Sequence, residues 1–489
     1  MEQLNASSAD ARGRYDLVAW LFLRALALIY LVAFASLGFQ ITALAGSEGI
    51  YPISESLAEA RGLYGADAWW RLPTLFWIFD GDWALTGACL AGAVFSLYLL
   101  FSRRERFALI ALFVLYLSLS AAGRVFLHFQ WDYLLLEAGF LAIFLPGGNR
   151  IVVWLFRWLL IRLRLLSGLA KLASGDAGWR EFTALNHYFE TQPLPHAGAW
   201  FAHQLPEWLL RIGTGATLIV ELVVPFFMFL PRTFRLWAAG LTVLWQLLII
   251  ATSNHNFFNL LTIALCLFLL DDQFVRRFVP ARIATAAARD PTLTANPSRA
   301  GWALTSVLAV VLVVFSTALS IEVLRGSPYQ NFPAPIATAW DAARALRIAN
   351  RYHVFPTITT ERIELEIEGS IDDGRSWQTY GFRYKPSDPA RRPAFINPHQ
   401  PRIDWQIWFT PLDARFLDWF DRFLSRLLEA SPTVLAQLGH DPFDGRRPDM
   451  LRVSAWRYRF ADPATRGETG LWWTREYLGP FRPLPFRER

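Results

Sequence analysis

The chain has 489 residues, of which 54% are hydrophobic and only 18% are charged. Because soluble proteins carry about 25% charged residues on average, this composition excludes a disordered chain, a fibrous repeat and an ordinary soluble enzyme. The net charge of +6 comes from basic residues that mostly flank apolar runs, whereas nucleic-acid-binding proteins gather them on one surface. We therefore expect a polytopic membrane protein with an attached domain, and no nucleic acid among its partners.

Apolar runs that could cross a membrane occur throughout the first two thirds of the chain. A membrane-spanning helix needs about 20 predominantly apolar residues. The sequence predicts nine candidate segments, of which the fourth and the eighth are short for a full crossing: residues 17–45, 83–101, 107–122, 133–146, 151–173, 212–230, 236–252, 257–270 and 302–324. Together they predict a transmembrane helix bundle over residues 1–325.

Arginines in the short connections indicate the orientation of the bundle. They follow the second and the sixth candidate segments and precede the ninth: Arg103, Arg104, Arg106, Arg232, Arg235, Arg276, Arg277, Arg282, Arg289 and Arg299. All of them lie on one side of the membrane if the N-terminus is cytoplasmic. We therefore expect the C-terminal region on the other side. That side is the periplasm for a bacterial inner-membrane protein, and the lumen of the endoplasmic reticulum in a eukaryote.

The chain after residue 325 has the pattern of a separate domain, residues 326–489. Ile363, Leu365 and Ile367 alternate with glutamates, which predicts a half-buried strand, and a turn at 372–374 leads into alternating aromatic residues that complete a hairpin. Residues 402–409 predict another strand, and residues 413–429 predict a helix. The expected fold is a polytopic α-helical membrane bundle followed by a mixed α/β, β-rich extramembrane domain.

The fifth candidate segment carries a row of basic side chains. Arg157, Arg164 and Lys171 are spaced by seven residues, so they share one helix face with Ser167. A charge at the membrane centre costs at least about 2.5 kcal/mol, so this face should meet protein, water or lipid headgroups. One interpretation is structural ion pairing or snorkelling at the interface. The other is a polar cavity in the bundle, with Lys171 available as a base or an anion ligand.

Acidic partners for this row are present elsewhere in the bundle, at Asp132, Glu137 and Glu221. We expect Asp132 and Glu137 to be the counter-charges of Lys171, because they belong to the preceding segment. Lys171 is also the single lysine of the membrane half, and lysine, unlike arginine, titrates when it is desolvated. Lys171 is therefore the one candidate for a catalytic residue.

The polar connection 174–208 contains three histidines without the spacing of a metal motif, and we expect them to be surface side chains: His187, His196 and His203. Cys89 and Cys266 lie far apart in apolar runs, with no histidine at ligand spacing. Neither a metal site nor a disulfide framework is therefore expected, and the residues identify no cofactor.

A second polar connection joins the seventh and eighth candidate segments at residues 254–256. Such a cluster between two apolar helices either caps a hairpin or lines the same outer cavity as Lys171. The candidates for a polar cavity are Asp132, Glu137, Arg164, Lys171, Asn254, His255 and Asn256.

Several blocks of sequence, in order between residues 125 and 410, have a distinctive composition. The most specific is LNHYFETQPLP at 185–195, and NPHQPRIDWQ at 397–406 is another. Their key residues, with two from the block at 129–132, are Gln130, Trp131, Glu190, Thr191, Gln192, Pro193, Asn397, Pro398, His399, Gln400, Asp404 and Trp405. These blocks resemble the lipase maturation factor family.

The resemblance implies a multi-span protein of the secretory pathway, which in animals resides in the endoplasmic reticulum membrane. It implies a function as a chaperone-like maturation factor that assists the folding and assembly of secreted lipases through a lumenal C-terminal domain. The implied partners are the lipid bilayer and a secreted client protein, with a lipase as the first candidate. We expect such a maturation factor to be non-enzymatic or cryptically enzymatic.

A weaker resemblance implies an alternative. Residues 168–172 (GLAKL) are similar to the segment of vitamin K-dependent γ-glutamyl carboxylases that carries their catalytic lysine. By this resemblance the chain would be an integral-membrane enzyme with Lys171 as base in an outer-facing cavity. The two functions differ in what they require: a maturation factor depends on its outer surface, and an enzyme depends on Lys171 and a cofactor-sized cavity.

Overall fold

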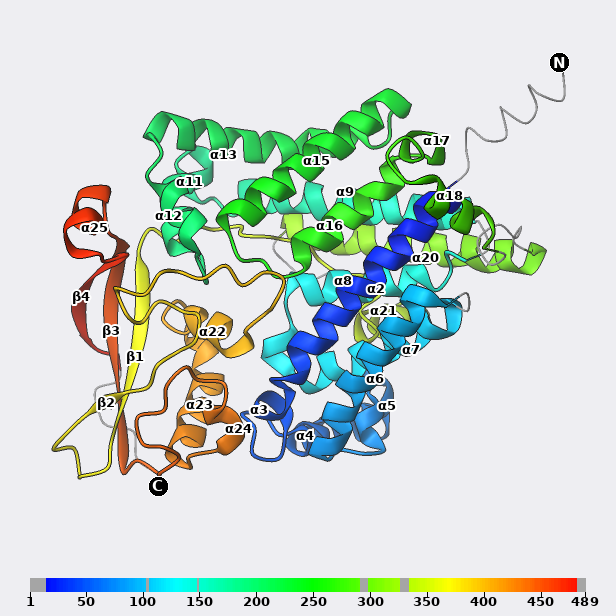
Figure 1. The fold of residues 1–489 in the computed structure, drawn as a ribbon. Coiled ribbons are helices and arrows are strands. Elements are labelled where there is room, and N and C mark those ends of the chain that lie inside the picture. The colour runs from blue at the N-terminus through cyan, green and yellow to red at the C-terminus, as the bar shows by residue number, and fades with distance from the viewer. Residues whose placement is uncertain (1–14, 103–104, 147–148, 291–297, 326–333, 482–489) are drawn as a thin grey trace, which may run out of the picture.

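The computed structural model of the chain describes residues 15–102, 105–146, 149–290, 298–325 and 334–481. Figure 1 shows a bundle of helices with the C-terminal region, including its sheet, at one end of it. Arg103 and Arg104 of the predicted basic connections, and residues 326–333 and 482–489 of the predicted C-terminal domain, lie outside the described residues.

Six helices among the described residues are long and apolar enough to cross a membrane. They are α2 (Asp16–Gly38), α6 (Asp82–Phe101), α7 (Glu105–Ala122), α13 (Glu207–Leu222) continued by α14 (Val224–Phe227), α15 (Arg232–Thr252) and α20 (Arg299–Arg325). Each coincides with a segment predicted from the sequence. The expected membrane bundle is therefore confirmed, and the protein is an integral membrane protein.

The other three predicted segments are helices that fall outside this set. α8 (Gln130–Ala142) has 13 residues, about 20 Å of helix against a hydrocarbon core of about 30 Å. α16 (Phe258–Cys266) is shorter still and is continued by one 3-10 turn, Leu267–Leu269. α9 (Arg150–Ala173) is long enough, but it carries several buried charges and contacts α8, α13, α16 and α20 inside the bundle. By length and composition alone, six of the nine predicted candidate segments qualify as full spans in the described chain. The fourth and the eighth were already expected to be short.

Polar contacts distinguish the two ends of the bundle. At one end, the backbone N–H groups of Leu17 and Val18 in the first turn of α2 donate to the Asp272 carboxylate of α17 (Asp272–Val275), at 3.1 and 3.0 Å. This contact satisfies donors that a helix start leaves free. At the other end, Gln40 Nε2 donates to the carbonyl oxygen of Gln400 at 2.9 Å. The C-terminal region therefore lies at the end of the bundle opposite the start of α2.

Close helix packing explains one conspicuous glycine in the core. A Cβ atom on Gly92 of α6 would lie 2.3 Å from the ring of Phe34 in α2. Glycine is therefore required for the approach of these two helices, which make an extensive contact.

The described bundle also contains short helices: α3 (Ile41–Ala45), α4 (Ile53–Tyr64), α5 (Ala68–Arg71), α10 (Ala177–Arg180), α11 (Ala184–Thr191), α12 (Ala197–His203), α18 (Ala281–Ala288) and α21 (Ala334–Ala345).

The C-terminal region contains a four-stranded antiparallel sheet in the order β2-β1-β3-β4. Its strands are β1 (Arg362–Ser370), β2 (Gln378–Thr379), β3 (Met450–Phe460) and β4 (Trp473–Pro480). The long central pair is in register with Glu366 opposite Ser454. The mixed α/β character predicted for this region is confirmed by this sheet together with α23 (Leu417–Leu428), α24 (Pro432–Leu435) and α25 (Pro463–Thr469).

The predicted hairpin is present, with a shorter second strand than expected. β1 turns at residues 372–374 into β2, where Glu368 lies opposite Thr379. Asp373 and Gly374 adopt φ of 55° and 84°, which the turn requires. Hydrogen bonds from the backbone and hydroxyl of Ser376 lower the pKa of the Asp372 carboxyl to about 2. The hairpin turn is thus held by a charged side chain.

The prediction of a strand over residues 402–409 is wrong, because this segment forms α22 (Arg402–Gln406) followed by a 3-10 turn, Ile407–Phe409. Polar and apolar residues alternate in this segment, as they do in a half-buried strand. Every side chain of α22 is buried, since the helix lies between the bundle and the sheet. The helix predicted over 413–429 is confirmed as α23, whose buried side includes Phe420, Phe423 and Leu427.

Candidate functional site

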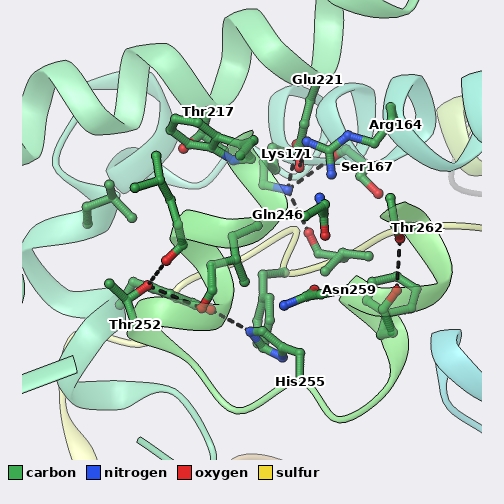
Figure 2. A pocket seen from close by; sticks show the side chains of 18 of the residues that line it. Arg164, Ser167, Lys171, Thr217, Glu221, Gln246, Thr252, His255, Asn259 and Thr262 are labelled. Atoms are coloured by element: carbon green, nitrogen blue, oxygen red, sulfur yellow. Dashed lines mark hydrogen bonds and ion pairs between the residues drawn. The ribbon is translucent and has the colours of Figure 1, made fainter. Parts of the chain in front are cut away.

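A cavity of about 250 Å³ lies between α9, α13, α15 and α16. Figure 2 shows the polar side chains that surround it. Arg164, Ser167 and Lys171 reach it from α9, and Glu221 reaches it from α13. Leucine, isoleucine and aromatic side chains line much of the remainder. The cavity is therefore charged at one end and largely apolar elsewhere.

The charged end is built around one carboxylate. Lys171 Nζ lies 2.8 Å from Glu221 Oε2 and donates to the carbonyl oxygen of Val354 at 2.7 Å. Arg164 Nη2 lies 3.7 Å from Glu221 Oε1. The Lys171 ammonium also lies 5.0 Å from the centre of the Trp179 ring, a cation–π distance. The three charged side chains are buried, so their interactions are little screened by water.

The counter-charges that the sequence suggested for Lys171 are elsewhere. Asp132 is bound by Arg402, with Nη1 and Nη2 at 2.7 and 2.9 Å from its two oxygens. Glu137 forms an ion pair with Arg162. Both carboxylates project from α8 toward other partners, whereas Lys171 faces α13. A helical face read from sequence shows which side chains lie together, but it does not show which neighbouring helix they meet.

The row of basic residues on α9 therefore divides among different environments. Arg157 lies away from the cavity, where its Nε donates to the carbonyl oxygen of Phe268 at 2.7 Å and its Nη2 to Tyr15 at 2.6 Å. Arg162, which sequence reasoning missed, is buried beside Glu137. Arg162 does not belong to the seven-residue spacing of the row. The only sign of it in the sequence was therefore a charged residue within an apolar run. The row is partly structural and partly cavity-lining.

The connection at residues 254–256 contributes one side chain to the cavity and two to the surrounding scaffold. His255 lines the cavity, and its Nε2 lies 2.7 Å from the hydroxyl of Tyr188. Asn254 Nδ2 donates to the carbonyl oxygens of Leu194 and Ala394, at 3.0 and 2.9 Å. Asn256 Nδ2 donates to Gln400 Oε1 at 2.8 Å. The two asparagines thus join the bundle to the C-terminal region.

The motif at residues 190–193 is held by the C-terminal region. Arg362 of β1 donates to the carbonyl oxygens of Glu190, Gln192 and Pro193, at 3.0, 2.5 and 2.9 Å. The carbonyl oxygen of Thr191 accepts from Trp408 at 2.8 Å. The Glu190 carboxylate accepts the backbone N–H of Phe460 at 2.6 Å, and burial raises its pKa. These motif residues serve as a docking point for the sheet.

The motif at residues 397–400 makes the reciprocal contacts to the bundle. Asn397 Nδ2 donates to the carbonyl oxygen of Ser253 at 3.0 Å. After Pro398, His399 Nδ1 lies 2.8 Å from the hydroxyl of Ser36 in α2. The motif is part of the interface between the C-terminal region and the bundle, since its polar side chains bond to bundle residues that are far away in sequence.

The motif residues near α22 continue this interface. Trp405 packs edge-on against Trp131 of α8, with ring centres 5.0 Å apart. Gln130 Nε2 lies 3.2 Å from His353 Nδ1. The Asp404 carboxylate accepts the backbone N–H groups of Tyr384 and Lys385, at 2.8 and 2.9 Å, and burial raises its pKa. The key motif residues therefore do not line the cavity, whereas Leu185, Tyr188 and Phe189 of the block at 185–195 do.

The three histidines of the connection 174–208 are not all surface side chains. His196 is buried and its Nδ1 accepts the backbone N–H of Gly198 at 2.9 Å, so it caps the start of α12. Burial lowers the pKa of His196 and of the half-buried His203. In the described part of the chain, no group of three or more histidine, cysteine, aspartate or glutamate side chains is placed to hold a metal ion.

The fold and the interface define an integral membrane protein with a β-containing C-terminal region docked on one end of its bundle. A family model described as "Lipase maturation factor transmembrane domain" matches residues 17–277. A second, described as "Lipase maturation factor C-terminal domain", matches residues 348–483. The chain belongs to the lipase maturation factor family.

Curated relatives are similar to the chain over almost its whole length. "Lipase maturation factor 1" of Bos taurus is 33% identical, over 96% of this chain and 89% of the relative. "Lipase maturation factor 2" is 33% identical in Mus musculus and 32% identical in Homo sapiens, each over 95% of this chain and 82% of the relative. No solved structure matches the chain. None of these matches bears the name of a carboxylase, so the alternative enzyme has no support from them.

Proposed function

We propose that this protein is a membrane-bound maturation factor that assists the folding or assembly of a secreted lipase. The observation that carries the proposal is the similarity to proteins named lipase maturation factor, which extends over both matched domains and over 95–96% of the chain. In this function the bundle anchors the protein, and the C-terminal region contacts the client.

The structure supports separate roles for the bundle and the C-terminal region. The interface between bundle and C-terminal region is extensive and polar, so the sheet is held in a fixed place relative to the membrane. β4 stands at one edge of the described sheet, and most of its side chains are exposed. An edge strand offers backbone donors and acceptors that can pair with another chain. We propose this edge as the surface for a partly folded client.

A gene deletion in the source organism tests the function. We expect the activity of secreted lipases to fall several-fold while lipase synthesis stays unchanged, and the full chain to restore that activity. A secreted phosphatase from the same cells is the control and should keep its activity. Unchanged lipase activity in the deletion strain would contradict the proposal.

We also propose that the N-terminus is cytoplasmic and that the C-terminal region is periplasmic or, in a eukaryotic host, lumenal. This orientation needs an odd number of crossings, so one or all three of α8, α9 and α16 cross the membrane in addition to the six long apolar helices. Two observations support it. Arg232 of one basic connection pairs with Asp271, next to the start of α2, and Arg106 donates to the carbonyl oxygen of Pro146 at 3.0 Å, before α9. The described basic connections thus gather at the end of the bundle that lies opposite the C-terminal region, as positive residues do on the cytoplasmic side.

Alkaline phosphatase fusions test this orientation, because the enzyme is active only after export. A fusion after Arg489 should be active, and an insertion between α18 and α20 should be inactive at equal expression. The insertion is the matched control, since it reports the opposite side of the membrane. An inactive fusion after Arg489, in a well-expressed protein, would refute the orientation.

A further inference from the structure

The charged end of the cavity has one more positive charge than negative charge. Lys171 and Arg164 both face Glu221, the single acidic residue among the described residues that line the cavity. Lys171 takes the close position at 2.8 Å, whereas Arg164 Nη2 remains at 3.7 Å, beyond hydrogen-bond distance. Because a guanidinium keeps its proton in proteins, Arg164 leaves a surplus cation in the bundle.

Hydrogen-bond donors at this end also lack partners. In the part of the chain that the structure describes, Nε and Nη2 of Arg164 and Nδ2 of Asn259 are buried without one. These side chains are only 6% and 1% exposed, and both border the space shown in Figure 2. Unpaired buried donors are costly, so such a site favours an acceptor.

Another buried arginine shows how this protein pairs most donors of a surplus cation where no ligand is needed, with only the Nε of Arg362 left without a partner. Arg362 shares the Glu364 carboxylate with Lys385, which also gives two cations for one anion. There the guanidinium donates to three backbone carbonyl oxygens. No described hydrogen bond of this kind reaches Arg164, so an external anion is the group that would complete its site.

From the charged end, the cavity continues along apolar side chains to the surface of the bundle. Trp245 and Ile249 of α15 line this part. Leu205 and Leu248 also line it, and they are 43% and 48% exposed, so the cavity opens between them. α15 is one of the helices that are long and apolar enough to span a membrane, and in the bilayer its outward face would meet lipid. A ligand could therefore enter from the bilayer.

The size of the cavity limits the ligand. An apolar cavity of about 150 Å³ accepts benzene, so the volume of about 250 Å³ here suits a small head and part of one acyl chain. A phospholipid with two chains in the cavity is too large. A ligand that matches the surplus positive charge, the unpaired donors and the apolar part of the cavity is an amphiphile.

We propose that the cavity binds a single-chain lipid with an oxyanion head, either a carboxylate or a phosphate monoester. Arg164 pairs with the head, and Asn259 donates a further hydrogen bond to it. The Lys171–Glu221 ion pair stays intact beside the head. The acyl chain follows α15 toward the opening at Leu205 and Leu248, with its end in the bilayer.

Photo-crosslinking of the full chain in phosphatidylcholine nanodiscs tests the proposal. The probe is a radiolabelled hexadecanoic acid with a diazirine on its chain. We expect saturable labelling that maps to α15, and at least tenfold weaker competition by hexadecanol, which has the same chain without the charge. Hexadecanoate and hexadecyl phosphate are compared as competitors, and the stronger one identifies the head. Displacement by inorganic phosphate alone, or by hexadecanol as effectively as by hexadecanoate, would overturn the proposal.

Two variants and a control locate the site. Arg164→Gln should weaken probe binding at least tenfold because it removes the surplus charge, and Ile249→Trp should weaken it by filling the channel. Arg150→Gln removes the same charge from the exposed start of α9 and should bind like the wild type. If Arg164→Gln does not fold, Ile249→Trp still tests the site. Wild-type binding by a folded Arg164→Gln, or by Ile249→Trp, would contradict it.

Discussion

Replacing Arg402 with alanine should lower the unfolding free energy by about 3–5 kcal/mol, because the buried Asp132 carboxylate then has no cation as a partner. Arg402 of α22 and Asp132 of α8 form two parallel hydrogen bonds, at 2.7 and 2.9 Å, and their side chains are 2% and 0% exposed. Tyr116 donates to the same carboxylate at 2.6 Å. The Arg402→Ala variant leaves Asp132 with that hydroxyl and no cation. Thermal and denaturant unfolding of the purified full chain measure the loss.

An exposed ion pair across the same interface provides the matched control. Arg422 of α23 pairs with Glu55 of α4 at 2.9 Å, with both side chains 40% or more exposed. Such a pair contributes at most about 1 kcal/mol, so Arg422→Ala should unfold almost like the wild type. The double variant Arg402→Met with Asp132→Leu should regain most of the loss, since neither charge remains buried. Equal stability of Arg402→Ala and Arg422→Ala would show that the buried pair does not hold the interface.

The elements that the sequence predicted well are those defined by local patterns. The six long apolar helices follow from hydropathy, which depends on neighbouring residues and on the thickness of the bilayer. β1 and its turn follow from two-residue alternation and from Asp373 and Gly374. α22 was wrongly predicted as a strand. It lies in an interface, where polar Arg402 and Asp404 are buried among partners as completely as apolar Ile403 is, so its sequence does not show the single apolar face of an ordinary helix.

The site depended on contacts between distant residues, which one sequence does not reveal. Lys171 and Arg164 could be placed on one face of a helix, but their shared partner Glu221 was chosen by the packing of α9 against α13. Asp132 finds its arginine 270 residues further along the chain. Most key residues of the family motifs, which resemblance marked as important, line the interface between the bundle and the C-terminal region. Their spacing contains no sign of that role.

Replacing Arg362, which holds the motif at residues 190–193, should have the second large effect on stability. Its side chain is fully buried, it pairs with Glu364 at 2.5 Å, and it supplies the donors for the carbonyl oxygens of Glu190, Gln192 and Pro193. Replacing it with methionine keeps the apolar stem but removes every donor. Because several buried acceptors then lose their partners together, we expect a loss of about 3–5 kcal/mol in unfolding free energy.

Hydrogen exchange can separate this local effect from a general loss of stability. In Arg362→Met the peptide covering residues 184–196 should exchange faster than in the wild type, under conditions where α2 stays protected. Arg362→Lys should fall between the two proteins, because an ammonium can pair with Glu364 but does not present the planar set of donors that reaches three carbonyl groups. Arg452→Met is the control in the same sheet: Arg452 is 45% exposed and pairs with Glu368 at 2.7 Å, so its loss should cost less than about 1 kcal/mol. If residues 184–196 exchange alike in Arg362→Met and Arg452→Met, the motif is fixed by its own helices, and Arg362 only occupies the space beneath it.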